Sequence, residues 1–304
     1  MNRKNYSSQT KIFSFLILFA LASNLSSDIE DNIALHKEQF SEVALKIWEY
    51  AELGYQETKS SNLLASELEK EGFKITKRVA GIPTAFVAEF GSSGPVIGIL
   101  GEFDALPGLA QTNSPFKEVA INDSGGGHAC GHHLFGAASA WAAVSIKEWL
   151  VENDIEGTVR FYGTPAEEGG SGKVYMVREG LFDDVDVVLH WHPDDVNSAN
   201  PKTSNSNKSA KFTFKGISAH AAGSPELGRS ALDGVEAMNM MVNMMREHIP
   251  QESRMHYVIT KGGLAPNVVP DLAEVYYYVR HPEMKVVEEL FQRVVKTAEG
   301  AARG

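Results

Sequence analysis

The feature that most restricts the fold of this chain is an alternation of two hydrophobic periods over its first two thirds. Apolar residues recur with helical spacing in 38–52 and 60–71, and β-rich runs follow at 84–90 and 96–100. The later elements keep this alternation: a helix over 131–150, a strand at 158–162, a helix at 171–179 and an apolar run at 185–189. Strands that alternate with helices predict an α/β layer with a mainly parallel sheet.

The order of the elements changes after 197–207, a segment rich in Ser, Asn and Pro that we interpret as a linker. Beyond it we expect a strand at 210–215, a helix at 225–247, strands at 255–260 and 273–279, and a helix from near Glu283. This β-α-β-β-α order is an α+β, ferredoxin-like unit without its fourth strand. The sequence therefore predicts domains at 28–205 and 206–304, and a chain that is incomplete at its C-terminus.

Residues 1–22 have the organisation of a secretory signal peptide. Three basic residues and no acidic residue lie in 1–11, and the apolar run 12–22 ends in Ala20-Leu21-Ala22, a small-x-small cleavage pattern. The run has about half the length that spans a bilayer. A buried N-terminal helix is the alternative interpretation. We expect a secreted or periplasmic protein without a membrane span.

Charge and cysteine content make several classes of protein poor candidates. The 304 residues carry a net charge of -11, whereas nucleic-acid binding and adsorption to anionic membranes both need basic surfaces. The one cysteine, Cys130, excludes an intramolecular disulfide and gives a redox protein no second thiol for a resolving pair. A lone thiol in an exported protein is a reactive liability unless it is buried or has a function, and its neighbours indicate a function.

Three polar clusters occur where loops meet predicted strands or helices, and ligands of open α/β sheets gather at the carboxyl ends of strands. In the first, 125–133, Cys130 and His132 are two residues apart and flanked by glycines before a predicted helix. Thiolate and imidazole are ligands that zinc favours, and a position before a helix lowers the pKa of a thiol. By itself, Cys-Gly-His is equally compatible with a chance cysteine beside a histidine-rich turn.

The second cluster, 163–170, contains adjacent carboxylates, Glu167 and Glu168, directly after a predicted strand. Such pairs normally belong to a solvated surface, but this one lies between Pro165 and two glycines at the end of the strand. One carboxylate could bind a metal ion while the other activates a water molecule. Hydrolysis at a metal requires both roles.

The third cluster, 186–193, contains His190 and His192, which the period of two places on one face of a strand. His192 lies at the C-terminal end, where a site is expected, and His190 is predicted to be a core histidine. The combined candidates form a mixed set of sulfur, nitrogen and oxygen ligands: Cys130, His132, one glutamate of the 167/168 pair and His192. Such a set suits Zn(II), with Mn(II) or Co(II) as alternatives.

Together these clusters resemble the aminoacylase and carboxypeptidase-G family of di-metal peptidases and amidohydrolases. The branch that they resemble contains the N-acyl-amino-acid amidohydrolases of the p-aminobenzoyl-glutamate hydrolase type. The matching segments follow the family's order over almost the whole chain after the leader: 101–108, 127–132, 165–169, 191–193, 216–222 and 262–270.

The resemblance implies a role for each residue of the first domain's clusters. Cys130 corresponds to a thiolate that bridges two metal ions, and Glu167 to the general acid/base that deprotonates a metal-bound water. Asp104 corresponds to an aspartate that orients a ligand, and Glu102 stands where other branches carry a metal-binding histidine. Three further residues correspond to metal ligands: His132, Glu168 and His192.

In the second domain, the resemblance implies that His220 reaches the active site of the partner subunit in a homodimer. It also implies that Asn267 and Arg280 contact substrate, the alternatives being a turn asparagine and a solvated arginine. Family members return to the catalytic domain after this lid or dimerisation domain and supply a last histidine ligand there. Because this chain ends at Gly304, it resembles a C-terminally truncated member.

The implied function is metal-dependent hydrolysis of an amide bond next to a carboxylate, in N-acyl amino acids, aminobenzoyl-glutamate or dipeptides, with two divalent metal ions. The alternative is an inactive truncated relative that acts as a binding or regulatory partner of a full-length chain. Whether the coding sequence continues in frame beyond Gly304 distinguishes these hypotheses.

Overall fold

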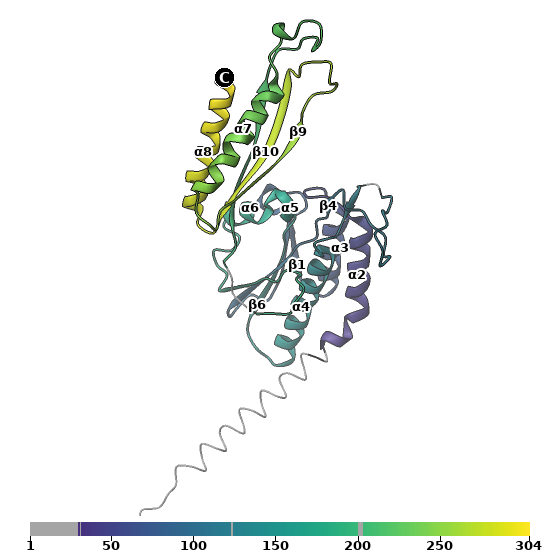
Figure 1. Ribbon diagram of the computed structural model, residues 1–304. Helices are drawn as coiled ribbons and strands as arrows, with labels where there is room; N and C mark the ends of the chain where they lie inside the picture. The colour runs from purple at the N-terminus through teal and green to yellow at the C-terminus, as the bar shows by residue number, and fades with distance from the viewer. Residues whose placement is uncertain (1–29, 31, 123, 200–202) are drawn as a thin grey trace, which may run out of the picture. The chain divides into compact units, whose positions relative to one another are not determined.

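The computed structural model describes residues 30, 32–122, 124–199 and 203–304, which form two compact units that divide between Asn197 and Ser198 (Figure 1). The predicted signal peptide at 1–22 lies outside the described residues. Within the described part, no helix combines the length and apolar character needed to cross a membrane. The finer domain limits expected from the sequence stay predictions.

A five-stranded sheet forms the centre of the first unit. Its order is β1-β2-β6-β3-β7, with bounds Lys74–Lys77 (β1), Phe86–Phe90 (β2), Thr158–Gly163 (β6), Val96–Gly101 (β3) and Val187–Leu189 (β7). Strands β6, β3 and β7 are parallel, whereas β2 is antiparallel to both β1 and β6. The α/β class is confirmed, and the sheet is mixed because the connection from β1 to β2 is too short for the crossover that parallel neighbours need.

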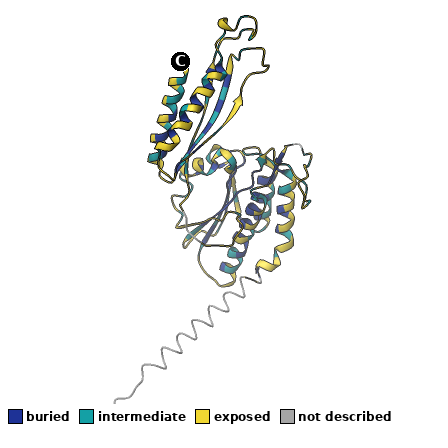
Figure 2. Cartoon of the chain, viewed as in Figure 1, coloured by how far each residue is buried: buried dark blue, intermediate teal, exposed yellow. Residues whose placement is uncertain are grey.

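The helices of the first unit are Lys37–Tyr50 (α2), Thr58–Lys70 (α3), His132–Glu152 (α4), Glu167–Gly170 (α5) and Gly172–Arg178 (α6). Helices α2 and α3 each bury one side and expose the other, whereas the short α5 buries no residue (Figure 2). In α2, Phe40, Val43, Ala44 and Ile47 follow helical spacing and join a core that also contains Leu64, Phe103 and Phe161. Two short strands, β4 (Leu106–Pro107) and β5 (Gly126–Gly127), pair just before α4.

The second unit is a three-stranded antiparallel sheet, in the order β8-β10-β9, with two helices packed on one face. Its main elements are β8 (Ser206–Lys215), α7 (Ala231–Met245), β9 (Arg254–Lys261), β10 (Leu272–His281) and α8 (Met284–Arg303). Alternate residues of β10, among them Val275 and Tyr277, are buried against Val235 and Leu290. The predicted β-α-β-β-α order is confirmed. Strand β8 begins at Ser206, inside the segment interpreted as a linker, and short 3-10 helices (225–227 and 246–248) flank α7.

Candidate metal centre

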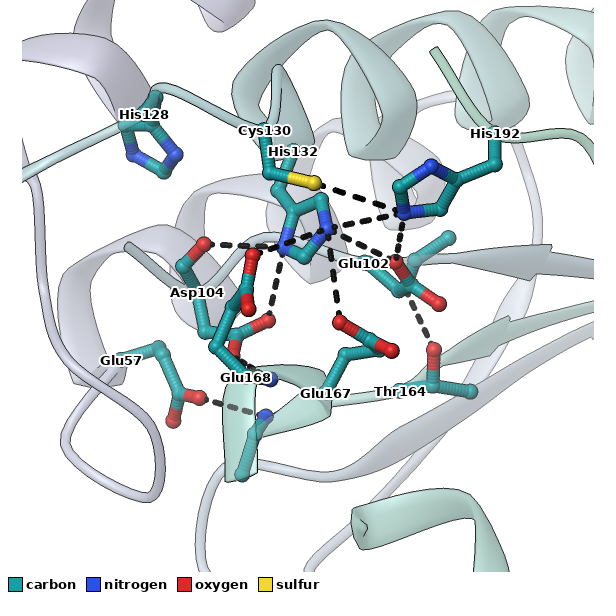
Figure 3. A network of polar contacts seen from close by, with 12 residues as sticks. Glu57, Glu102, Asp104, His128, Cys130, His132, Thr164, Glu167, Glu168 and His192 are labelled. Carbon is teal, nitrogen blue, oxygen red and sulfur yellow. Dashed lines mark hydrogen bonds and ion pairs between the residues drawn. The ribbon is translucent and has the colours of Figure 1, made fainter. Parts of the chain in front are cut away.

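The polar clusters converge at the carboxyl ends of three parallel strands (Figure 3). Glu102 and Asp104 follow β3, the glutamate pair follows β6, and the histidine pair follows β7. The N-terminus of α4 supplies Cys130 and His132 beside them. Parallel strands end at a common edge, so segments that are distant along the chain present their side chains to one site.

His132 is the central residue of this site and is completely buried. Its Nδ1 lies 3.1 Å from Asp104 Oδ1 and 3.0 Å from the Asp104 carbonyl oxygen, which are both acceptors. When the imidazole is neutral, its proton therefore lies on Nδ1, and Nε2 has the lone pair that a metal ion needs. This Nε2 lies 3.0 Å from Glu102 Oε2 and 3.4 Å from His192 Nε2. A histidine oriented by a carboxylate on its other nitrogen is the usual arrangement of a metal ligand.

Two overlapping groups of side chains offer ligand atoms that lie within 4.8 Å of one another: Cys130, His132 and His192; and Glu102, His132, Glu167 and His192. Cys130 Sγ lies 3.7 Å from His192 Nε2, and Glu102 Oε2 lies 3.7 Å from the same nitrogen. Glu168 Oε1 lies 3.9 Å from His132 Nε2. The two groups share both histidines, and one imidazole nitrogen binds one metal ion, so together the groups form a single cluster of candidate ligand atoms.

The charges of the site fit a divalent cation. Glu102 Oε2 and Glu168 Oε1 are buried and accept no hydrogen bond of ordinary geometry, and His132 Nε2 lies 3.0 Å from the first and 3.9 Å from the second. Buried carboxylate oxygens need a compensating donor or cation. Burial acts to raise the pKa of Glu102, but the hydrogen bond from His190 and the charge of Lys173 hold that pKa below its ordinary value. Glu102 is therefore an anion, and either a protonated imidazole or a metal cation held between its Oε2 and the two histidines would balance its charge.

The thiol of Cys130 differs from the sequence-based prediction. Burial and the negative charges of Glu168 and Glu167 raise the pKa of this thiol to about 12, so the prediction that its position before a helix lowers the pKa was wrong. The carboxylates outweigh the start of α4. A thiolate forms here when a cation binds and releases the proton.

The structure also corrects the prediction for His190 and adds Glu102 to the candidate ligands. His190 was expected in the core, but its side chain is 40% exposed, because β7 is an edge strand whose residues are all exposed. Its Nε2 lies 3.5 Å from Glu102 Oε1. Glu102 was not predicted as a ligand in this chain, although its place two residues before Asp104 puts both side chains on one face of the extended segment.

Three candidate residues belong to the second unit. His220 and Asn267 lie together there: the Ala221 N–H donates to the Asn267 carbonyl at 3.0 Å, and His220 pairs with Val268 in an isolated bridge. Arg280 lies near the far end of β10, eight residues beyond Leu272 and on the order of 26 Å along the strand. The unit therefore brings His220 and Asn267 together and keeps Arg280 apart from them.

Comparisons with known proteins agree with this geometry. A family model described as a peptidase dimerisation domain matches residues 203–304. The chain is 48% identical over 275 residues to one of the subunits of p-aminobenzoyl-glutamate hydrolase from Escherichia coli, covering 90% of this chain and 57% of that protein. The solved structure of a dinuclear metal-binding peptidase of the M20 family from Bacillus subtilis superposes with a TM-score of 0.57 at 25% identity, covering 89% of this chain and 71% of that one. This chain belongs to the M20 peptidase family. The resemblance predicted from its motifs is confirmed.

A second relative, the mouse Xaa-Arg dipeptidase, is 31% identical over 278 residues, which cover 87% of this chain and 60% of the mouse protein. The chain thus spans 57% and 60% of the lengths of these two curated relatives. Dinuclear metal binding in the M20 family agrees with the two overlapping ligand groups of the first unit.

Proposed function

We propose that this chain carries the metal centre and general base of an amidohydrolase that cleaves an amide bond next to a carboxylate. The substrate class is N-acyl amino acids, aminobenzoyl-glutamate or dipeptides, which agrees with the names of the two relatives above. The observation that carries the proposal is the convergence of two buried carboxylate oxygens, which accept no hydrogen bond of ordinary geometry, with the Nε2 atoms of His132 and His192, beside the exposed Glu167.

The residues proposed to hold two divalent ions are Cys130, His132, His192, Glu168 and Glu102. We propose Zn(II) because of the thiolate and imidazoles, with Mn(II) or Co(II) as alternatives that the carboxylates would accept. Bound there, such ions would polarise the substrate carbonyl and acidify a water molecule. Asp104 keeps the proton on Nδ1 of His132 and so keeps the opposite nitrogen available.

The adjacent glutamates differ in a way that supports different roles. The side chain of Glu167 is 41% exposed, and its Oε2 lies 3.9 Å from His132 Nε2. The side chain of Glu168 is 18% exposed, and its backbone N–H donates to Asp104 Oδ2 at 2.9 Å. Glu167 is therefore free to take the proton of the attacking water and to deliver it to the leaving amine, whereas Glu168 is held as a ligand.

Assembly and localisation complete the proposal. The dimerisation-domain match supports a homodimer, in which His220 would reach the partner subunit's site and stabilise the developing oxyanion. Asn267 and Arg280 are proposed substrate contacts. The leader at 1–22 supports a secreted or periplasmic protein. An inactive binding partner is not favoured, because the chain retains the ligand groups and Glu167.

The test combines hydrolysis with metal content. We expect Glu167→Gln to keep its metal and to lose roughly 10²-fold or more in kcat on p-aminobenzoyl-glutamate, N-acyl amino acids and dipeptides, the usual scale for a general base. Its matched control, Glu168→Gln, should instead lose metal, as measured by elemental analysis. An undiminished rate in Glu167→Gln, or equal metal loss in both variants, contradicts the division of roles.

A further inference from the structure

We propose that Glu57 is a positioning residue: its buried carboxylate holds the amide of Ala166 and thereby fixes the loop from which Glu167 and Glu168 project. Glu57 belongs to neither ligand group of the metal centre. The effect on hydrolysis rests on the proposed function, whereas the effect on the loop does not.

Glu57 connects two segments that are more than a hundred residues apart. It immediately precedes α3 and is completely buried. The Ala166 N–H donates to Glu57 Oε1 at 2.8 Å, and Thr84 Oγ1 donates to Glu57 Oε2 at 3.0 Å. Both carboxylate oxygens are therefore used by uncharged donors, and one of these donors is the backbone immediately before the catalytic pair.

The backbone at Ala166 needs such a partner. Ala166 has φ 57° and ψ 44°, the left-handed conformation, which is unfavourable for a residue with a Cβ. A residue persists in this conformation where its surroundings over-determine it. Ala166 is fully buried, its carbonyl accepts the Gly170 N–H at 3.1 Å, and Gly54 packs so closely that a Cβ there would lie 3.1 Å from Ala166 Cα.

Two buried carboxylates hold the amides on either side of Glu167. Glu57 accepts from Ala166, and Asp104 accepts from Glu168 at 2.9 Å. Asp104 also orients His132, so its removal would disturb the ligands directly. Glu57 has no hydrogen bond to a ligand side chain in the described part of the molecule. Replacing Glu57 therefore tests the position of the loop separately from metal ligation. The position of the loop matters because small misplacements of catalytic groups lower reaction rates strongly.

The test uses the full chain, with Glu57→Ala compared with Glu57→Gln, which keeps an acceptor for the Ala166 amide. Hydrogen–deuterium exchange is followed at the Glu168 and Gly170 amides, neither of which bonds to Glu57. We expect Glu57→Ala to accelerate exchange at both by roughly tenfold or more, with α2 unchanged, and Glu57→Gln to restore protection. On a hydrolysed substrate, kcat should fall roughly tenfold to hundredfold, with metal content and KM near wild type.

Unchanged exchange at these two amides would overturn the proposal, because Glu57 would then have no effect on the loop. Equal acceleration in α2 would overturn it as well, because it would indicate a general loss of stability. Should Glu57→Ala not fold, Thr84→Val removes one of the two hydrogen bonds of Glu57 and should accelerate the same two amides by a few-fold; no acceleration there overturns the proposal as well. Absence of hydrolysis by wild type would refute the proposed function, while the exchange result would still decide the role of Glu57.

Discussion

Two imidazoles, those of His132 and His192, are shared by the two ligand groups of the site. His132 belongs to both, and Asp104 fixes which of its nitrogens is available. Burial lowers the pKa of His132, but the hydrogen bond and charge of Asp104 and the charge of Glu102 outweigh this, so its pKa is raised. Proton and metal thus compete for the same nitrogen. Residue types and their place at the ends of predicted strands were enough to predict that Cys130, His132 and His192 come together, as the structure shows. The pKa of the Cys130 thiol was not predictable, because it depends on how many carboxylates the fold gathers around it.

Glu57 gives a pH-dependence that can be measured without substrate. Burial raises its pKa from 4.5 to about 7, so between these values the unfolded chain loses the proton first and stability falls as pH rises. The loss amounts to at most about 3 kcal/mol. We expect Glu57→Gln to remove this part of the pH-dependence in urea unfolding with a chelator present. Glu69→Gln, at an exposed position of the same helix, is the control. A Glu57→Gln profile parallel to wild type from pH 4.5 to 8 would contradict the assignment.

At the scale of elements, the hydrophobic periodicity of the sequence predicted the helices that bury an apolar face. Helices α2, α3 and α4 were expected because each must bury an apolar face. Strand β1 was missed because its residues are mostly exposed, so pairing with β2 and not side-chain burial holds it in place. Glu57 was also missed, because no sequence motif identifies a residue whose proposed role is to hold the backbone of a distant loop. An ion-pair network of His36, Glu71, Lys147 and Glu148 further ties α2, α3 and α4 together.

The close approach of α4 to the end of β3 predicts a sensitive position. A Cβ at Gly136 would lie 2.6 Å from the Glu102 carbonyl oxygen and 3.2 Å from Leu64 Cδ1. Gly136→Ala should therefore force α4 away from β3, cost about 1–3 kcal/mol and weaken metal binding, because Glu102 and His132 lie on the two separated elements. Gly300→Ala in α8 is the matched control: its Cβ meets Met241 only at 3.8 Å, so it should stabilise by about 0.5–1 kcal/mol. Equal unfolding free energies for the two variants would rule this out.

At the scale of the whole molecule, each unit has its own hydrophobic core and its own sheet. Both ligand groups of the candidate metal centre lie within the first unit, and the dimerisation-domain match covers the second. Order along the chain predicted both units, since strands alternate with helices in one and form a split unit in the other. The contribution of His220 to a partner's site, which the resemblance implies, stays a prediction because it depends on assembly.

Assembly can be tested by complementation. If His220 acts in the partner subunit's site, mixing His220→Ala with Glu167→Gln protein should restore activity. A mixed dimer would contain one site with both residues intact, so an equal mixture should recover up to about a quarter of wild-type activity if subunits exchange freely. Subunit exchange is verified with differently labelled chains. Proven exchange without recovery would place the action of His220 within one chain or remove it from the reaction.

The central claim is that the two overlapping groups bind metal, and the two exposed histidines after β7 test it most directly. His192 belongs to both groups, whereas His190 belongs to neither and faces the other oxygen of Glu102. Their side chains are 38% and 40% exposed, so replacing either should leave the fold intact. The measurement is metal per chain by elemental analysis of wild type, His192→Ala and His190→Ala after dialysis. Wild type and His190→Ala should retain metal and His192→Ala should lose most of it, whereas equal metal content in the two variants, or none in wild type, would contradict the account.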